Sequence, residues 1–238
     1  MPHQQKHRGP HIRDAELFSE ESMRILREAA RDMVYLLNRS FPENASLKLV
    51  GDRYRLQQRQ RTALMRCVCG DEAQQKRGRK EISVKDLGGQ RVAIDGYNLL
   101  ITTECALSGG ILLYGRDGCY RDLASVHGSY RKVEETLPAI RLMGKALAEI
   151  GVSEAFWWLD APISNSGRLK KMLLAEAQEA GWPWQAELVP NPDKVLVQCA
   201  EIVLSSDSWV IENSLHWANF QAYLIEQKIS TNSIRYFI

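Results

Sequence analysis

The sequence has no apolar run that approaches the roughly 20 residues needed to cross a bilayer, although 45% of its 238 residues are hydrophobic. Its first ten residues, MPHQQKHRGP, are polar and lack the apolar stretch of a secretory signal peptide. These absences argue against a membrane-spanning or secreted protein. We therefore expect a cytoplasmic location and no membrane partner.

Cysteine is also sparse, with five residues at positions 67, 69, 105, 119 and 199. An odd, scattered set does not indicate a disulfide framework in a chain of this length. Cys67 and Cys69 form a C-x-C motif, but no second pair lies near them to complete a zinc site. We expect these cysteines to be free thiols in apolar surroundings.

Motifs for nucleotide cofactors are absent as well. The sequence has neither G-x-G-x-x-G after a strand nor a P-loop, so we expect no nucleotide cofactor. Tyr97 follows Asp95 by two residues, which removes the second acid that a phosphatase of the haloacid dehalogenase type needs. The sequence shows no internal repeat and carries no signal for an oligomeric state.

Charge is unevenly placed, although the net charge is only +2. Residues 1–88 hold 18 Lys and Arg against 12 Asp and Glu, whereas residues 89–238 hold 13 against 17. A basic part joined to an acidic part suggests that one part grips a polyanion and the other carries functional carboxylates.

The N-terminal part predicts a small all-α domain. We expect residues 1–18 to form a disordered arm and residues 19–80 a basic helical domain. Apolar residues recur at helical spacing after Ser19, a plausible N-cap. A second helix is expected over about 53–69. Residues 70–80, GDEAQQKRGRK, have the composition of a linker or exposed loop.

Residues 89–238 predict an α/β domain, because short apolar strands alternate with helical segments. The Asp-Gly turn within 115–118 predicts a hairpin. A parallel sheet with helices on both faces follows from this order. The expected strands are 91–95, 154–159, 185–189, 202–204 and 234–238, and the expected helices are 137–150, 166–180 and 216–229.

Carboxylates follow several of the expected strands. Asp95, Asp160 and Asp207 each stand at or just after a strand end, and Asp193 follows another by a few residues. Carboxyl ends of parallel strands meet at one edge, where a cluster of like charges needs a neutralising cation. Mg²⁺ or Mn²⁺ fits such a site. Any one of these residues taken alone is more simply explained as the start of a loop or a helix cap.

The sharpest motif is D-G-Y-N at residues 95–98, followed by W-L-D-A-P-I-S-N-S-G at 158–167 and S-S-D-S at 205–208. In D-G-Y-N, Gly96 would let the chain turn off the strand, and Asn98 would place an amide near Asp95 to orient a metal-bound water or bond the substrate. These segments resemble the acidic motifs of the PIN and NYN ribonuclease folds. With L-V-G-D-R-Y at 49–54, nearly the whole chain past residue 20 resembles the domain of unknown function 434 family, which pairs a helical N-terminal domain with a PIN-like C-terminal domain.

The resemblance implies a PIN-like parallel sheet flanked by helices and metal chemistry at its acidic edge, but no known substrate. When the family's metal-ligand positions are carried over to this sequence, Asp95 would be the central ligand and Asp160 the second. Asp207 would be the third, directly or through water, and Asp193 matches the family pattern less closely. An acidic residue on an intervening helix, Glu134 or Glu135, remains open as a further ligand.

Two further groups of residues suggest contacts to nucleic acid. Residues 164–168 form a glycine-containing loop before a helix, and such a loop exposes N–H groups to anions. The expected phosphate-binding residues are Ser164, Ser166, Arg168, Ser206 and Ser208. A plain Ser166 N-cap is the simpler explanation for this loop.

The expected RNA-binding residues lie in the densest basic run of the sequence; they are Arg53, Arg55, Arg59 and Arg66. On one helix Arg55, Arg59 and Arg66 would share a face, and arginine is favoured where phosphates are gripped. A solvated helix surface is the alternative.

Two functions therefore remain open. One is an enzyme that hydrolyses RNA with Mg²⁺ or Mn²⁺, in which Asp95, Asn98, Asp160 and Asp207 form the catalytic group. The other is a non-catalytic PIN-like module that binds RNA or a ribosome-associated partner. The number of convergent carboxylates separates them.

Overall fold

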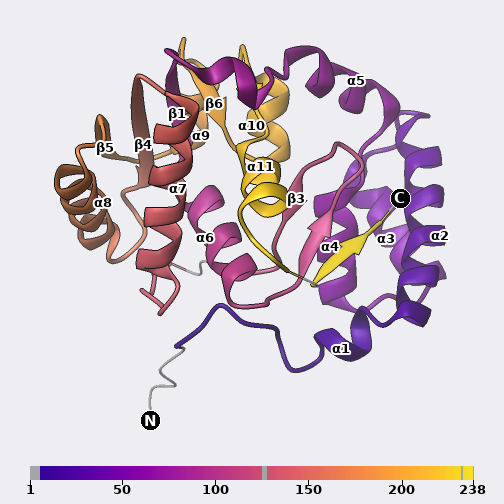
Figure 1. Ribbon diagram of the computed structural model, residues 1–238. Coiled ribbons are helices and arrows are strands. Elements are labelled where there is room, and N and C mark those ends of the chain that lie inside the picture. Colours follow the sequence, from indigo (N-terminus) through magenta and orange to yellow (C-terminus); the bar gives the residue numbers. More distant parts are fainter. Residues whose placement is uncertain (1–5, 125–127, 232, 238) are drawn as a thin grey trace.

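The computed structural model describes residues 6–124, 128–231 and 233–237. Figure 1 shows its arrangement. The α-helices are α1 Asp14–Leu17, α2 Glu20–Leu37, α3 Glu43–Arg53, α4 Gln58–Cys67, α5 Asp71–Lys80, α6 Gly96–Leu107, α7 Thr136–Ile150, α8 Ser166–Ala180, α9 Pro192–Leu196, α10 Ser208–Asn213 and α11 Phe220–Gln227, and a short 3₁₀ helix spans Val84–Leu87. The strands are β1 Arg91–Asp95, β2 Leu112–Tyr114, β3 Tyr120–Arg121, β4 Glu154–Asp160, β5 Trp184–Val189, β6 Ile202–Leu204, β7 Trp217–Ala218 and β8 Ile234–Tyr236.

The large sheet has five parallel strands in the order β5-β4-β1-β6-β7, with β1 in the centre. This confirms the expected α/β class with a parallel sheet. Side chains of β1 alternate between two apolar clusters: Val92 and Ile94 pack on one face and Ala93 on the other. Burial on both faces explains why the strands read as nearly continuous apolar runs.

Helices cover both faces of this sheet (Figure 1). The larger cluster joins one face to α6, α7, α8 and α11. The smaller one joins the opposite face to α9 and α10. Gly151 and Gly181 cap α7 and α8 with positive φ, and both helices end at the residues expected from the sequence.

A second sheet has three strands in the order β3-β2-β8. The predicted hairpin is confirmed by the antiparallel pairing of β2 with β3, with Gly118 at φ 77° in its turn. The predicted C-terminal strand forms, but it pairs with β2 and not with the large sheet.

The N-terminal region is helical, as predicted, and Ser19 caps α2 by accepting from Ser22 N. Its apolar residues share one cluster with Ile111, Leu113 and Phe237 from the second sheet. The helices α2–α5 are called the helical unit below. Because of this shared cluster, α2–α4 pack directly against the α/β part, and α5 contacts α10 through the Arg77–Glu212 ion pair.

Three expectations for this region are wrong. The arm expected over 1–18 has defined contacts from residue 6 onward: Arg8 pairs with buried Glu104, and Asp14 is buried in α1; residues 1–5 lie outside the described residues. Residues 71–80 form α5 and not a linker, since they are mostly good helix formers with acids in the first turn and bases in the last. The helix expected over 53–69 is broken at Arg55, whose φ is 51°.

Two further differences lie in the α/β part. The segment 216–229, in which one helix is expected, begins with the strand β7, and the helix α11 starts only at Phe220. The helix α6 follows Asp95 directly, where the apolar pattern predicted no helix. Within the described ranges, no helix is long and apolar enough to span a membrane.

Candidate functional site

The strand order of the large sheet reverses beside β1. From β1 the chain moves outward to β4 and β5, and then returns to β6 and β7 on the other side. In an open α/β sheet, a crevice forms at such a switch point, beyond the carboxyl ends of the strands. Here Asp95, at the end of β1, lies at this switch point beside segment 205–207, directly after β6.

Asp95 is buried, with 8% of its surface exposed. Its Oδ2 accepts a hydrogen bond from Ser205 Oγ at 2.7 Å. Burial raises the pKa of Asp95 to about 7, and the charges of Asp207 and Asp193 act in the same direction, while the Ser205 hydrogen bond opposes them. The carboxyl is therefore poised between its neutral and charged forms near neutral pH.

Asp95 differs from the other buried carboxylates in the part of the chain that the structure describes. Each of the others has an arginine nitrogen within 4.0 Å, and they are Asp14, Glu104, Asp117 and Asp122. No ion pair of this kind forms at Asp95 among the described residues. A buried carboxylate without a cation is costly, so this position suits an external cation or a proton.

Asn98 fixes the segment after β6 to α6. Its Oδ1 accepts from both Ser206 N and Ser206 Oγ at 2.9 Å. Asp207 N donates to Ser205 Oγ at 3.0 Å, and Asp207 Oδ1 caps α10 by accepting from Trp209 N and Val210 N. One oxygen of Asp207 is thus committed to the helix cap, whereas Oδ2 takes no part in it.

A cleft of about 350 Å³ opens beside this segment. Its lining includes Arg66 of α4, Tyr97 and Asn98 of α6, and Ser206 and Asp207 after β6. The cleft therefore lies between the helical unit and the carboxyl edge of the large sheet. The predicted Asn98, Ser206, Asp207 and Ser208 all line it.

Asp160 and Asp193 take different positions along this edge. Asp95 pairs in register with Trp158, so Asp160 lies two residues further along β4. Burial raises the pKa of Asp160. Asp193 is exposed in the first turn of α9, and its charge acts on Asp95. Asp207 and Asp193 are thus the acidic neighbours that influence Asp95.

The loop before α8 holds the remaining predicted phosphate-binding residues. Ser164 bonds through its backbone to Gly128 and Tyr130, Ser166 is buried, and Arg168 is exposed. The N-cap of α8 is Asn165, at φ 72°, and not Ser166. These residues do not line the cleft that contains Ser206 and Ser208. The cleft therefore does not bring together the two sets of predicted phosphate-binding residues.

The four predicted RNA-binding arginines do not form one free helical face. Arg53 and Arg55 are exposed, and Arg55 lies between α3 and α4. Arg59 bonds both oxygens of Asp14, and Arg66 donates to the carbonyl oxygens of Asp122 and Ala124. Arg59 and Arg66 thus attach α4 to neighbouring segments, and Arg66 also borders the cleft.

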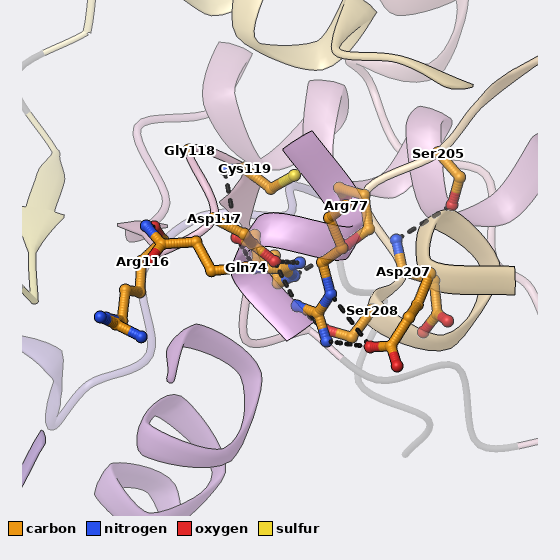
Figure 2. Close-up of polar contacts among 12 residues, drawn as sticks. Gln74, Arg77, Arg116, Asp117, Gly118, Cys119, Ser205, Asp207 and Ser208 are labelled. Carbon is orange, nitrogen blue, oxygen red and sulfur yellow. Dashed lines mark hydrogen bonds and ion pairs between the residues drawn. The ribbon is translucent and has the colours of Figure 1, made fainter. Parts of the chain in front are cut away.

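Sequence reasoning missed an ionic cluster next to this site. Arg77 of α5 and Arg121 of β3 both bind Asp117 in the hairpin turn, and Figure 2 shows Arg77 beside Asp117. Burial alone would raise the pKa of Asp117, but Arg121 and Arg77 outweigh it and lower the pKa to about 2. The R-D-G turn was visible in the sequence, whereas nothing in the spacing linked it to Arg77, forty residues earlier.

The described residues contain no group of three or more His, Cys, Asp or Glu side chains placed to hold a metal ion. Mg²⁺, however, usually binds one or two protein carboxylates and keeps waters and substrate oxygens as its other ligands. The unpaired Asp95 and the Oδ2 of Asp207 offer hard oxygen donors of this kind. The residues present fit a partly hydrated divalent cation and not a closed protein cage.

Gly96 in the D-G-Y-N motif is required by close packing. A Cβ at this position would lie 2.8 Å from the Trp158 carbonyl oxygen and 2.5 Å from Leu159 Cδ2. We expect Gly96→Ala to lower the free energy of unfolding by about 1–3 kcal/mol, because β4 must move away. Gly167→Ala is the matched control near the start of α8, where a Cβ meets nothing within 4 Å. Urea unfolding of both variants measures the effect, and equal stabilities would contradict it.

The fold and site define a doubly wound α/β domain with a buried carboxylate at its switch point and an N-terminal helical unit. Residues 84–223 match the family described as "Domain of unknown function (DUF5616)", and residues 25–80 match "Protein of unknown function (DUF434)". The first match covers more than half of the chain, so the chain belongs to the DUF5616 family. The DUF434 resemblance seen across nearly the whole sequence thus holds for the helical unit, and a separate family describes the α/β part.

A relative spans both parts. "Uncharacterized protein MJ0935" of Methanocaldococcus jannaschii is 30% identical over 188 residues, which is 79% of this chain and 89% of the relative. No solved structure matches the chain.

Proposed function

We propose that this protein is a PIN-like ribonuclease that uses Mg²⁺ or Mn²⁺ at Asp95. The observation that carries the proposal is the buried carboxylate of Asp95 at the switch point of the sheet, which pairs with no arginine or lysine among the described residues. Charges of Asp207 and Asp193 act on it. A divalent cation would relieve this repulsion and the cost of burial. The resemblance of residues 95–98 to the first motif of PIN and NYN ribonucleases supports the same chemistry.

The chain's own residues would divide the work as follows. Asp95, with Asp207 Oδ2 and Asp160 or Asp193 through water, would hold the cation. Asn98 uses Oδ1 to hold Ser206, which leaves its Nδ2 protons for a substrate oxygen. Arg66 brings positive charge to the cleft that Asn98 and Asp207 line, whereas Asp95 does not line it. When bound, the cation would supply charge stabilisation at the phosphodiester and activation of water.

One assay tests this function directly. Labelled single-stranded and hairpin RNAs are incubated with the protein in Mg²⁺ or Mn²⁺ and, as a control, in a chelator. We expect cleavage only with the metal. We also expect Mn²⁺ to raise the melting temperature, because a ligand that binds only the folded state stabilises it by RT ln(1 + [L]/Kd). Uncleaved RNA together with an unchanged melting temperature in Mn²⁺ would contradict the proposed ribonuclease activity.

The second function, a non-catalytic module that binds RNA or a ribosome-associated partner, is favoured by one observation. The described residues lack a three-ligand metal group, and Asp207 uses one oxygen as a helix cap. In that case the candidate contacts are the exposed Arg55 and Arg53, of which Arg53 pairs with Asp32 at an exposed position, since Arg59 is bound to buried Asp14. A negative result in the assay above, with salt-dependent RNA binding retained, would give this module first place.

A further inference from the structure

A chain of ionic contacts runs from the helical unit to the site. Arg77 Nη2 of α5 binds Glu212 Oε2 of α10 at 3.0 Å, and Arg77 Nη1 binds Asp117 Oδ2. Arg121 Nη1 and Nη2 bind the two oxygens of Asp117 at 2.8 and 2.7 Å. Figure 2 shows the Arg77 side chain reaching Asp117 of the hairpin and Ser208 at the start of α10.

The last link of this chain is the candidate site itself. Arg121 Nε donates to the carbonyl oxygen of Ser206 at 2.7 Å. The N–H and hydroxyl of the same residue are bound to Asn98 Oδ1. Ser206 is therefore held through its carbonyl by Arg121 and through its other polar groups by Asn98. Its neighbours are Ser205, which donates to Asp95, and Asp207, so their placement depends on the same contacts.

The contacts are nearly closed to solvent. The side chains of Arg77, Asp117 and Arg121 are 8%, 2% and 6% exposed. The Arg77 and Arg121 guanidinium groups face the carboxylates of Asp117 and Glu212, and Lys76 also pairs with Glu212 at 3.5 Å. Buried ion pairs add little net stability compared with apolar packing, but their fork geometry fixes the relative position of the groups they join. Here they join α5, the hairpin, α10 and segment 205–207.

We propose that Arg77 and Arg121 are positioning residues that hold segment 205–207 for the site at Asp95, and that the helical unit, through Arg77, is a structural part of that site. The consequence for metal binding rests on the proposed function. The positioning of the segment does not, since it follows from the contacts alone.

The test is local hydrogen exchange of the metal-free full-length chain. In Arg77→Gln, exchange of the Ser206 and Asp207 amides should accelerate about tenfold, because a hydrogen-bonded charge network is lost. Amides of β4 and α7 should exchange as in the wild type. Arg79→Gln is the matched control, because Arg79 lies on the same helix, is exposed and bonds only to the Gln75 carbonyl among the described residues. It should leave both regions unchanged.

Arg77→Lys provides a second variant if Arg77→Gln does not fold. It keeps the charge but loses the fork, so a smaller acceleration at Ser206 and Asp207 is expected. Unchanged exchange at these amides, or an equal acceleration in β4 and α7, would overturn the proposal, because either result describes no more than a global stabilising contact.

Mn²⁺ titration separates this proposal from the proposed function. If the wild type binds Mn²⁺, Arg77→Gln should bind it about tenfold more weakly, and unaltered affinity would overturn the link to the metal. Faster exchange at Ser206 with no Mn²⁺ binding by the wild type would support the positioning role and remove the metal-dependent function. Unchanged exchange at Ser206 and Asp207 in Arg77→Gln, together with RNA cleavage by the wild type, would overturn the positioning role and leave the proposed function standing.

Discussion

Asp95→Asn is expected to reduce RNA cleavage by at least about a hundredfold while the fold remains intact. The amide has nearly the shape of the carboxylate and can still accept from Ser205 Oγ, so packing around β1 is preserved. It brings no charge to a divalent cation, which removes the central ligand of the proposed site. Initial rates on labelled RNA in Mn²⁺ measure this loss, and a variant with near-wild-type rates would contradict the role of Asp95.

The same substitution should change the pH dependence of stability in the absence of metal. The pKa of Asp95 is raised from 3.8 to about 7 in the folded chain. Between these values the unfolded chain is charged and the folded chain keeps its proton, so stability falls as pH rises through this window and stays level above it. Below pH 3.8 both forms are protonated and the contribution vanishes.

Asp95→Asn should therefore match the wild type near pH 3.5 and exceed it at pH 8, by a few kcal/mol at most. Added Mn²⁺ should stabilise the wild type at pH 8 more than the variant. Asp86→Asn serves as the control, since Asp86 is an exposed residue of the 3₁₀ helix. Denaturant unfolding at the two pH values decides the matter: a variant less stable than the wild type at pH 8 would show that Asp95 carries a structural charge.

Asp117→Asn is expected to have the largest effect on stability, a loss of about 3–5 kcal/mol at pH 7. It leaves Arg77 and Arg121 buried without their shared carboxylate. Removing one partner of a buried ion pair leaves an uncompensated charge, which costs far more free energy than replacing both partners by apolar residues. Asp52→Asn is the matched control, because Asp52 pairs with Arg61 at a largely exposed position and should cost no more than about 1 kcal/mol.

Acid should reproduce part of this loss in the wild type. The pKa of Asp117 is lowered to about 2, so its contribution is present above pH 3.8 and is lost as pH falls towards 2. Urea unfolding at pH 7 compares Asp117→Asn with Asp52→Asn. A similar small loss in both variants would mean that water reaches the Arg77 and Arg121 guanidinium groups and that the cluster is not effectively buried.

The helices and strands with clear local signals could be predicted from the sequence. α8 begins and ends where the apolar spacing and Gly181 place it, and β4 ends at Asp160. α6 was missed because it is buried nearly all round, and a helix without a polar face has no amphipathic period. The charged composition of α5 is typical of a linker, and only the folded chain shows that it is a helix whose Arg77 is buried.

The candidate site divides in the same way. That Asp95 and Asp160 end parallel strands, and that Asp207 closely follows another, was predicted from the order of apolar runs, since parallel strands share one carboxyl edge. Which of these carboxylates influence one another did not follow, because that depends on strand order and on helix caps. Asp207 lies three residues beyond the end of β6, the strand next to β1, and also caps α10.

The sequence by itself determined the α/β class, the helical N-terminal part and the strand-end carboxylates, because hydrophobic period, caps and turn residues act over a few neighbouring positions. Only the tertiary structure decided which arginines are free and which are bound. Arg59 and Arg66 join α4 to residues 14 and 122–124, and Arg77 reaches a hairpin forty residues away. Such pairings depend on how whole elements pack, and buried charges must find partners wherever packing brings one within reach.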